Sequence, residues 1–353
     1  MALPYEGLEE YNQAIQAKAG TLLDEFVGLL PEHSEIAQWA LDQVKEYTLR
    51  PSKRIRGSLA ASAYDQAKNG QLLEAGLQLG AAIEIVQNYL LIIDDVIDRS
   101  ATRRGKPTIH RLYQEATKSD EREADMAGIL IGSLPGQIVN YVISQIDEQP
   151  EAKLAVIRML ALDLTITDLA QIDDIRHQFG REISEEELLR KYEQKSSYYS
   201  FVNPLACGLT LAGCDEVAAR QDAERFGLPA GIAFQLRDDY LGVFGDSNQT
   251  GKPNLDDMRE GKYTYMVHLA MKRISDTQRE TLEHILGNER AGQAELESLQ
   301  AILSETGASD EAMARAERYV ETARQAAEEA SSWSSPFGKL LAGLVEFSVR
   351  RHA

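Results

Sequence analysis

Residues 83–98 read IEIVQNYLLIIDDVID, an almost unbroken apolar run that ends in aspartates. On a helix this run is apolar on nearly every side, which is typical of a buried central helix. Asp94 and Asp98 lie one turn apart on the same helical face, with about 6 Å between their β-carbons, and Asp95 lies beside them. Carboxylates this close repel one another unless cations are present, and hard oxygen ligands suit magnesium. The run therefore favours a magnesium site, with a solvated acidic helix end as the alternative.

A second apolar helix ends in acidic residues in the same way. Residues 232–240 read IAFQLRDDY, so that Asp238 and Asp239 follow directly on the apolar run. The two aspartate-ended helices look like a distant pair, although no short-period repeat is visible in the chain.

The rest of the chain also has a helical pattern, since apolar residues recur at intervals of three and four and rarely alternate. This periodicity predicts an all-α protein. The expected helices cover residues 8–29, 36–47, 54–68, 71–98, 122–147, 151–178, 184–211, 215–243, 259–287, 293–305, 309–331 and 336–352. Because no Gly/Ser-rich or Pro-rich linker interrupts them, we expect one domain over residues 1–353.

Composition limits the classes of function. The 353 residues include 37 basic and 56 acidic ones, a net charge of −19, which repels nucleic acid unless a local basic patch exists. Cys207 and Cys214 are too few for a disulfide framework and lack the spacing of a metal knuckle. The N-terminus lacks the basic and apolar regions of a signal peptide, and no uninterrupted apolar stretch approaches the ~20 residues of a membrane span. We therefore expect a cytoplasmic protein without nucleic acid or membrane insertion.

Basic residues cluster near the acidic helix ends. The segment RRGKP, residues 103–107, follows Asp98 closely, and its Gly and Pro predict a loop. Guanidinium groups match phosphate oxygens, so this pairing favours a metal–phosphate site, with an internal salt-bridge cluster as the alternative. A lone lysine on a helix, such as Lys195 in YEQKS, is ordinarily just solvated. The other short basic segments are SKRIR, TGKP and EGK, which contain Lys53, Arg56, Lys252 and Lys262.

Together these motifs resemble one family, the isoprenyl diphosphate synthases. DDVID, TRRGKP, FQLRDDYLGVFGD, TGKP and EGK occur here in that family's order and spacing, over about residues 50–265. The resemblance implies the all-α isoprenoid synthase fold, a single large orthogonal helical bundle around a central cavity. It also implies a magnesium-dependent trans-prenyltransferase that joins isopentenyl diphosphate to an allylic diphosphate. The short-chain bacterial geranylgeranyl and farnesyl diphosphate synthases are the most similar type.

The resemblance assigns the candidate site residues. It implies up to three magnesium ions on the allylic diphosphate, held by Asp94, Asp95, Asp98, Asp238 and Asp239. The residues that grip the same diphosphate correspond to Arg103, Lys195, Lys252 and Lys262. The pocket for isopentenyl diphosphate corresponds to Lys53, Arg56, Arg104 and Gln87. Gln235 matches the glutamine that faces the reacting carbons, and Ser196 replaces a common threonine while keeping its hydroxyl.

The sequence departs from the family pattern at two other places. One bears on whether the protein is an enzyme, and the other on the pocket for isopentenyl diphosphate. Gly242 stands where the second motif usually has a third aspartate, a change that favours a non-catalytic partner subunit of a true synthase. The five remaining motif aspartates favour an enzyme. Pro51 and Ser52 replace the usual Gly-Gly before Lys53. A terpene cyclase, which ionises the same kind of substrate, has no use for an isopentenyl pocket.

Product length is expected to depend on Tyr89 and Leu90. They precede Asp94 by five and four residues, about one turn or ~5.4 Å along the helix, where bulky family residues stop elongation. Because only one of the two is aromatic, the resemblance favours a twenty-carbon geranylgeranyl product over a fifteen-carbon farnesyl product. Ordinary core packing is the alternative for Tyr89. The resemblance also implies a homodimer.

Overall fold

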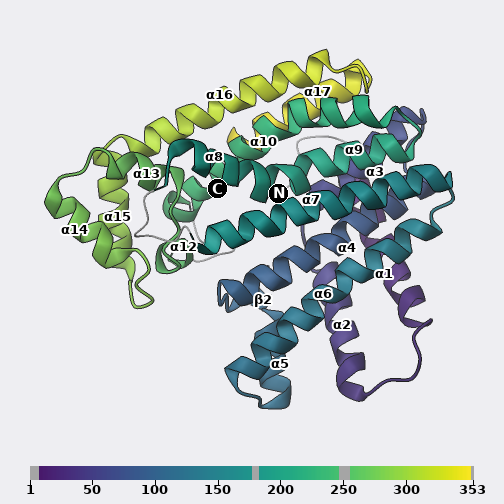
Figure 1. The fold of residues 1–353 in the computed structure, drawn as a ribbon, viewed down its shortest axis with the longest axis horizontal. Coiled ribbons are helices and arrows are strands. Elements are labelled where there is room, and N and C mark those ends of the chain that lie inside the picture. The colour runs from purple at the N-terminus through teal and green to yellow at the C-terminus, as the bar shows by residue number, and fades with distance from the viewer. Residues whose placement is uncertain (1–7, 177–182, 246–254, 351–353) are drawn as a thin grey trace. The chain divides into compact units, whose positions relative to one another are not determined.

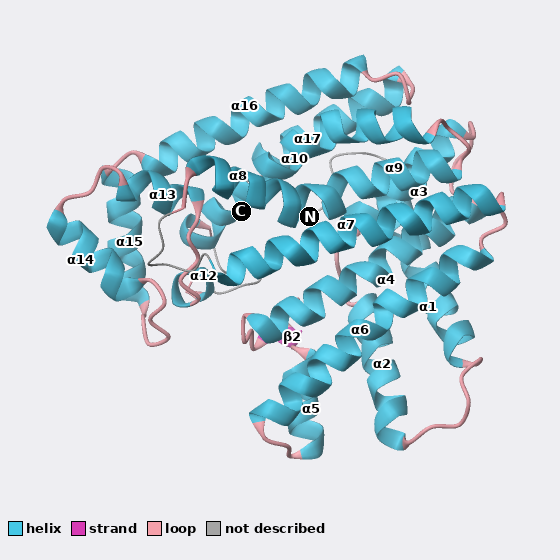
Figure 2. Ribbon diagram, in the orientation of Figure 1, coloured by secondary structure: helices cyan, strands magenta, loops and turns pink. Residues whose placement is uncertain are grey.

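The computed structural model describes residues 8–176, 183–245 and 255–350, so that Lys252 lies outside the described residues. Within these ranges the chain is helical apart from short connections and one small two-stranded ribbon (Figure 2). The predicted all-α class is confirmed. The chain divides into two compact units, which are described separately, and the expectation of a single domain stays a prediction.

The first unit comprises Met1–Leu160, Pro204–Arg220 and Ser332–Ser334. Its central helix is α4 (Glu74–Ile97), the apolar run predicted to be buried, which packs against four other helices of the unit (Figure 1). Those helices are α1 (Leu8–Val27), α2 (Glu35–Leu49), α3 (Ile55–Ala67) and α6 (Glu121–Gln145). The unit also contains α5 (Ile109–Thr117), the start of α7 (Pro150–Arg176) and nearly all of α9 (Asn203–Leu211).

Helices α3 and α4 cross at glycines. A β-carbon on Gly57 would lie 2.6 Å from the Gly80 carbonyl oxygen, and one on Gly80 would lie 2.7 Å from the Gly57 carbonyl oxygen. Only glycine permits this approach of two backbones. The crossing brings the N-terminal turn of α3, which follows Lys53 and contains Arg56, against the middle of α4.

A tight β-hairpin follows α4. Its strands are β1 (Thr102–Arg103) and β2 (Lys106–Pro107), paired antiparallel with Arg103 opposite Lys106. The two turn residues, Arg104 and Gly105, have φ of 55° and 73°, the positive values that a type I′ hairpin requires. The loop expected over RRGKP is therefore an ordered hairpin with an arginine in a left-handed conformation.

The second unit comprises Ala161–Asn203, Gln221–Ser331 and Ser335–Ala353. It contains the rest of α7 and most of α10 (Glu216–Phe244), the second aspartate-ended helix. A π-helical stretch, η1 (Glu193–Val202), continues directly from α8 (Glu185–Tyr192). The remaining helices are α12 (Asp256–Arg259), α13 (Tyr265–Met271), α14 (Asp276–Ile285), α15 (Gln293–Glu305), α16 (Ala308–Glu329) and α17 (Ser335–Arg350).

Two predicted helices differ from the structure. The stretch 184–211 consists of α8, η1 and α9, so a wider helical coil interrupts the expected α-helix. The stretch 259–287 contains two helices, α13 and α14, instead of one. Gly261 takes a positive φ of 69°, and two hydroxyl residues, Thr264 and Ser275, cap the new helices. Helix α5 was not expected.

Helices α4 and α6 are long and apolar enough to cross a membrane by length and composition alone. Most of the apolar window of α4 is buried inside the protein, as is just under half that of α6. The core helix of a globular protein has the same properties, so these two helices are weak evidence for a membrane span.

Candidate active site

The three aspartates at the end of α4 have different environments. Asp95 is fully buried: its Oδ1 accepts from Arg103 Nε at 2.7 Å and its Oδ2 accepts from the Tyr47 hydroxyl at 2.9 Å. Asp94 is more exposed and lies 3.6 Å from an Arg103 nitrogen, while the N–H of Asp98 closes the helix end on the Asp94 carbonyl. The cation that neutralises Asp95 is thus a guanidinium. Burial alone would lower the pKa of Arg103, but Asp95 beside it raises that pKa overall.

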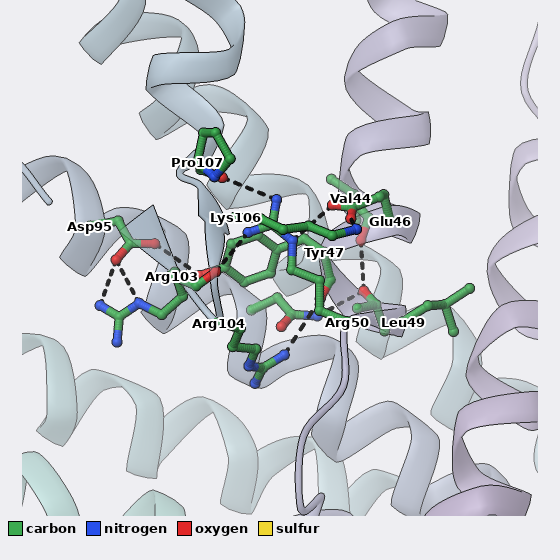
Figure 3. A network of polar contacts seen from close by, with 12 residues as sticks. Val44, Glu46, Tyr47, Leu49, Arg50, Asp95, Arg103, Arg104, Lys106 and Pro107 are labelled. Carbon is green, nitrogen blue, oxygen red and sulfur yellow. Dashed lines mark hydrogen bonds and ion pairs between the residues drawn. The ribbon is translucent and has the colours of Figure 1, made fainter. Parts of the chain in front are cut away.

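The hairpin directs its two arginines to different partners (Figure 3). Arg103 points to Asp95, whereas the Arg104 guanidinium lies apart from it, 5.9 Å from the Tyr47 ring centre and 3.5 Å from the Tyr47 carbonyl oxygen. Burial lowers the pKa of Arg104, and Glu84 is a carboxylate that opposes this shift. The charge of Arg104 therefore interacts with those of Glu84 and of Arg56 at the start of α3.

Those basic residues are organised by Glu84, a fully buried carboxylate of α4. Its Oε1 accepts from the Gly57 N–H at 2.9 Å at the α3–α4 crossing. The side-chain amide of Gln87 has one orientation in which both of its polar atoms form hydrogen bonds. In this orientation the Gln87 nitrogen donates to Glu84 at 3.3 Å and the Gln87 oxygen accepts from Arg56 at 2.8 Å. Burial raises the pKa of Glu84, although Arg56 and other arginines lower it in part. Arg56 and Gln87, both assigned to the isopentenyl pocket, are thus brought together.

A guanidinium clamp fixes the loop that carries Lys53, where Pro51 and Ser52 stand in place of the expected Gly-Gly. Arg54, which has a positive φ of 43°, is buried and donates to the carbonyl oxygens of Thr48, Arg50 and Ser52. This clamp fixes the loop before Lys53 without glycine.

In the second unit, the second motif forms a chain of hydrogen bonds. Ser196 Oγ donates to Gln235 Oε1 at 2.6 Å, and Gln235 Nε2 donates to Asp239 Oδ1 at 2.8 Å. The Tyr192 hydroxyl donates to Asp239 Oδ2 and accepts from the Tyr265 N–H at 2.9 Å. Burial raises the pKa of Asp239 to about 6. Both oxygens of Asp239 are therefore engaged with protein groups, as are those of Asp95 in the first unit.

Lys195 is paired rather than simply solvated. It shares the carboxylate of Asp174 with Lys191, which donates to Asp174 Oδ1 at 2.7 Å while Lys195 donates to Oδ2. Burial would raise the pKa of Asp174, but the two lysines hold it well below its ordinary value. Lys191 is nearly fully buried, whereas about a quarter of the Lys195 side chain is exposed. The cluster carries one net positive charge, and Lys195 is its more accessible member.

The missing third aspartate has a structural counterpart. A β-carbon on Gly242 would lie 2.2 Å from Oδ2 of Asp257, so the carboxylate of Asp257 occupies the space beside that glycine. Asp257 also accepts from Lys262 Nζ at 2.7 Å, and Glu260 lies 2.8 Å from the same nitrogen. Lys262 is therefore held next to the second motif by two carboxylates.

The carboxylates suit a metal ion that arrives with its ligand. Among residues 8–176, 183–245 and 255–350, no three or more His, Cys, Asp or Glu side chains converge on one point. Magnesium is usually bound through one or two carboxylates together with substrate phosphates and water, rather than by an all-protein cage. In each unit the carboxylates fit magnesium that arrives as a diphosphate complex, with Asp94, Asp95 and Asp98 as the candidate ligands in the first unit and Asp238 and Asp239 in the second.

The two residues assigned to product length lie on α4 as expected. Tyr89 and Leu90 are both half-buried, and the Tyr89 ring packs on α6 at Gly136, 3.7 Å from the point where a β-carbon would stand. The absence of a side chain at Gly136 leaves room for the ring.

With this geometry in hand, comparison with known proteins identifies the family. The polyprenyl synthetase family model matches residues 38–303, about three quarters of the chain. The chain belongs to the polyprenyl synthetase family. A geranylgeranyl diphosphate synthase from Sulfolobus acidocaldarius is 30% identical over 299 residues, which cover 85% of this chain and 87% of that protein. A farnesyl pyrophosphate synthase from Arabidopsis thaliana is 30% identical over 289 residues, covering 78% and 80%.

A solved structure supports the same conclusion. The geranylgeranyl pyrophosphate synthase of Corynebacterium glutamicum, crystallised with isoprenyl diphosphate and magnesium, matches with a TM-score of 0.90 at 26% identity over 98% of this chain and 99% of that one. The expected isoprenoid synthase fold is confirmed. This polyprenyl synthetase is a divalent-metal-dependent prenyltransferase of isoprenoid biosynthesis that makes short- to medium-chain trans products.

Three residues of this polyprenyl synthetase that contact the assigned ones lie outside its motifs and could not be predicted from them. Glu84 had a visible signal, a charged residue inside an apolar helix three places before Gln87. Asp174 had a weaker one, the acidic pair Asp173-Asp174 near the end of a predicted helix. Tyr47 had none, because its partner Asp95 is far along the chain and a tyrosine on an apolar face predicts only core packing.

Proposed function

We propose that this polyprenyl synthetase condenses isopentenyl diphosphate with allylic diphosphates to form geranylgeranyl diphosphate. The hairpin carries the proposal: it places Arg103 beside the aspartates of α4 and Arg104 within the field of Arg56 and Glu84. Guanidinium groups in two separate settings fit an enzyme that binds two diphosphates, whereas a terpene cyclase needs only one. Incubating the purified protein with both substrates and magnesium tests the proposal, because a cyclase would release hydrocarbon and a synthase a longer diphosphate.

The allylic diphosphate is proposed to bind with up to three magnesium ions at the aspartates of both motifs. Magnesium supplies Lewis-acid stabilisation of the departing diphosphate. Arg103, Lys195 and Lys262 add charge-assisted hydrogen bonds to the same leaving group, and Lys252 is assigned the same role by its motif. Each of the three described cations is already held by a carboxylate, which fixes its position before substrate arrives.

Ionisation of the allylic carbon–oxygen bond leaves a carbocation that must not meet a nucleophile. Gln235 is oriented for this task, since its nitrogen is held by Asp239 and its oxygen by the Ser196 hydroxyl. The amide therefore has a fixed dipole and no freedom to rotate. The isopentenyl double bond then attacks the cation, and the proton that leaves is taken up by the diphosphate.

The isopentenyl pocket yields the first prediction. Lys53→Ala and Arg56→Ala should each raise KM for isopentenyl diphosphate about 10- to 100-fold, because each removes a charge-assisted contact worth roughly 1.5–3 kcal/mol. KM for the allylic substrate should change much less. Initial-rate kinetics with each substrate varied in turn measure both values. An equal rise for the two substrates would mean that these residues only maintain the structure.

Product length yields the second prediction. Tyr89→Ala, alone or with Leu90→Ala, should lengthen the product by at least one five-carbon unit, because the ring no longer fills the space beside Gly136. Chromatography of the dephosphorylated products reports the chain lengths. Tyr64→Ala is the matched control, since it removes a buried aromatic ring from the same unit outside the assigned sites. Unchanged products in both Tyr89 variants would place the floor elsewhere, and a fifteen-carbon product from the native enzyme would make it a farnesyl diphosphate synthase.

A cytoplasmic homodimer is proposed as the working form. Helix α6 exposes Met126, Ile129 and Leu130, and the part of α7 in the second unit exposes Leu162, Leu169 and Ile172. Large apolar side chains gathered on a helix face are typical of a surface covered by a partner, and the implied partner is a second copy of this chain. Light scattering of the purified protein measures the oligomeric state, and a monomer would contradict the proposal.

A further inference from the structure

Arg50 is the largest fully buried side chain in the described part of the protein, and no motif accounts for it. It ends α2, where its guanidinium extends to the hairpin (Figure 3). Nη1 donates to the Arg103 carbonyl oxygen at 3.2 Å and Nη2 donates to the Pro107 carbonyl oxygen at 3.1 Å. One planar side chain thus ties both strands of the hairpin to α2.

The guanidinium is fixed in turn by neighbours on its own helix. Nε donates to Glu46 at 2.8 Å, and the group lies 4.7 Å from the centre of the Tyr47 ring. Glu46 also pairs with Lys106 on β2 at 2.5 Å, so a second contact joins the same helix to the same hairpin. Burying a charged group is costly unless its hydrogen bonds are satisfied, and an apolar residue would fill this space at lower cost. The position therefore calls for the directional bonds of arginine rather than for packing.

The hairpin needs such support because it is short and strained. Each strand has two residues, and Arg104 occupies a left-handed conformation that disfavours side chains larger than glycine. Isolated two-stranded hairpins are only marginally stable in water. Yet this hairpin must hold Arg103 and Arg104 in fixed but different directions.

We infer that Arg50 is a positioning residue that sets the affinity for both diphosphate substrates at once, by fixing the hairpin that presents one arginine to each. The inference rests on the proposed function of Arg103 and Arg104. It differs from the roles of Lys53 and Arg56, which concern one substrate only. Arg50 is assigned a positioning role rather than a binding role because its side chain is buried and both terminal nitrogens donate to backbone carbonyl oxygens of the hairpin.

The test compares two conservative changes at buried arginines. Arg50→Lys keeps the charge, but an ammonium lacks the planar fork that spans two carbonyls. We expect KM to rise about tenfold for the isopentenyl and the allylic substrate alike, the factor that corresponds to about 1.4 kcal/mol for each. The matched comparison is Arg54→Lys, because the Arg54 guanidinium donates to carbonyl oxygens of the loop before Lys53, whereas that of Arg50 donates to the two strands of the hairpin. It should raise KM for isopentenyl diphosphate alone.

Hydrogen–deuterium exchange of residues 99–108 supplies a readout that does not depend on activity. In Arg50→Lys this segment should exchange about tenfold faster, while α4 and α6 exchange as in the native protein. Glu46→Gln, which leaves Arg50 in place and removes its ion pair, should cause a smaller change of the same kind. Unchanged hairpin exchange would overturn the inference, and so would faster exchange throughout the unit or a rise in only one KM.

The exchange measurement also separates this inference from the proposed function. If the native protein failed to condense the two substrates, the proposed function would be wrong. Faster hairpin exchange in Arg50→Lys would still show that Arg50 fixes the hairpin. If the native protein were active and the variant showed native exchange and native KM values, only the positioning role of Arg50 would be wrong.

Discussion

Replacing Asp94 with alanine is expected to lower turnover by about 10³-fold or more, the largest effect of any single change proposed for this enzyme. A tenfold loss corresponds to about 1.4 kcal/mol, and stabilisation of a leaving group by metal-borne charge amounts to several. Asp94 is half-buried, and its carboxylate lies 3.6 Å from an Arg103 nitrogen. Its loss should weaken magnesium binding without leaving a buried charge unpaired, so the fold should survive.

The control for this prediction is Asp42→Ala, which removes an exposed carboxylate of α2 and should change stability by no more than about 0.5 kcal/mol and turnover hardly at all. Circular dichroism and initial rates at saturating magnesium compare the two variants. Near-normal turnover in a folded Asp94→Ala protein would remove the first motif from the metal site.

Lys195→Ala should lower kcat/KM for the allylic substrate by about 10²-fold. A charge-assisted hydrogen bond is worth about 1.5–3 kcal/mol, and charge on the leaving diphosphate grows in the transition state. Lys191 remains to pair with Asp174, so the buried carboxylate keeps a cation and the loss should fall on activity rather than stability. Steady-state kinetics and thermal unfolding measure the two quantities.

The neighbouring lysine supplies the matched comparison. Lys191→Met removes the buried partner of the same carboxylate, so it should lower the melting temperature more than Lys195→Ala and turnover less. If the two variants lost activity and stability in equal proportion, the division of roles between these lysines would be wrong.

The sequence predicted most of the helices because their pattern is local. The run over 83–98 specifies a buried helix by its apolar content alone, and the structure has α4 in that place, at the centre of its unit. Helices α15, α16 and α17 lie within about two residues of the ranges that their apolar periodicity predicted. The hairpin was not predicted because its strands are too short to show a period, and Gly105 and Pro107 indicated only a loop.

The candidate site was predictable only in part. Motifs identify charged residues, but they do not show which carboxylates form hydrogen bonds with other residues of the protein. Asp95 and Asp239 looked equivalent to their neighbours in sequence, whereas in the structure each accepts from a tyrosine far along the chain and from a second residue nearby in sequence. The sequence also did not show that the carboxylate of Asp257 occupies the space beside Gly242.

The most direct test of the central claim is the conversion of labelled isopentenyl diphosphate by the purified native protein. With magnesium and an allylic diphosphate, the label should enter a longer prenyl diphosphate, with one inorganic diphosphate released for each bond formed. Twenty carbons is the expected length, and chelation of the metal should abolish the reaction until magnesium is restored. Ionisation of the allylic substrate without incorporation of the label, or no turnover at all by the folded protein, would contradict the account.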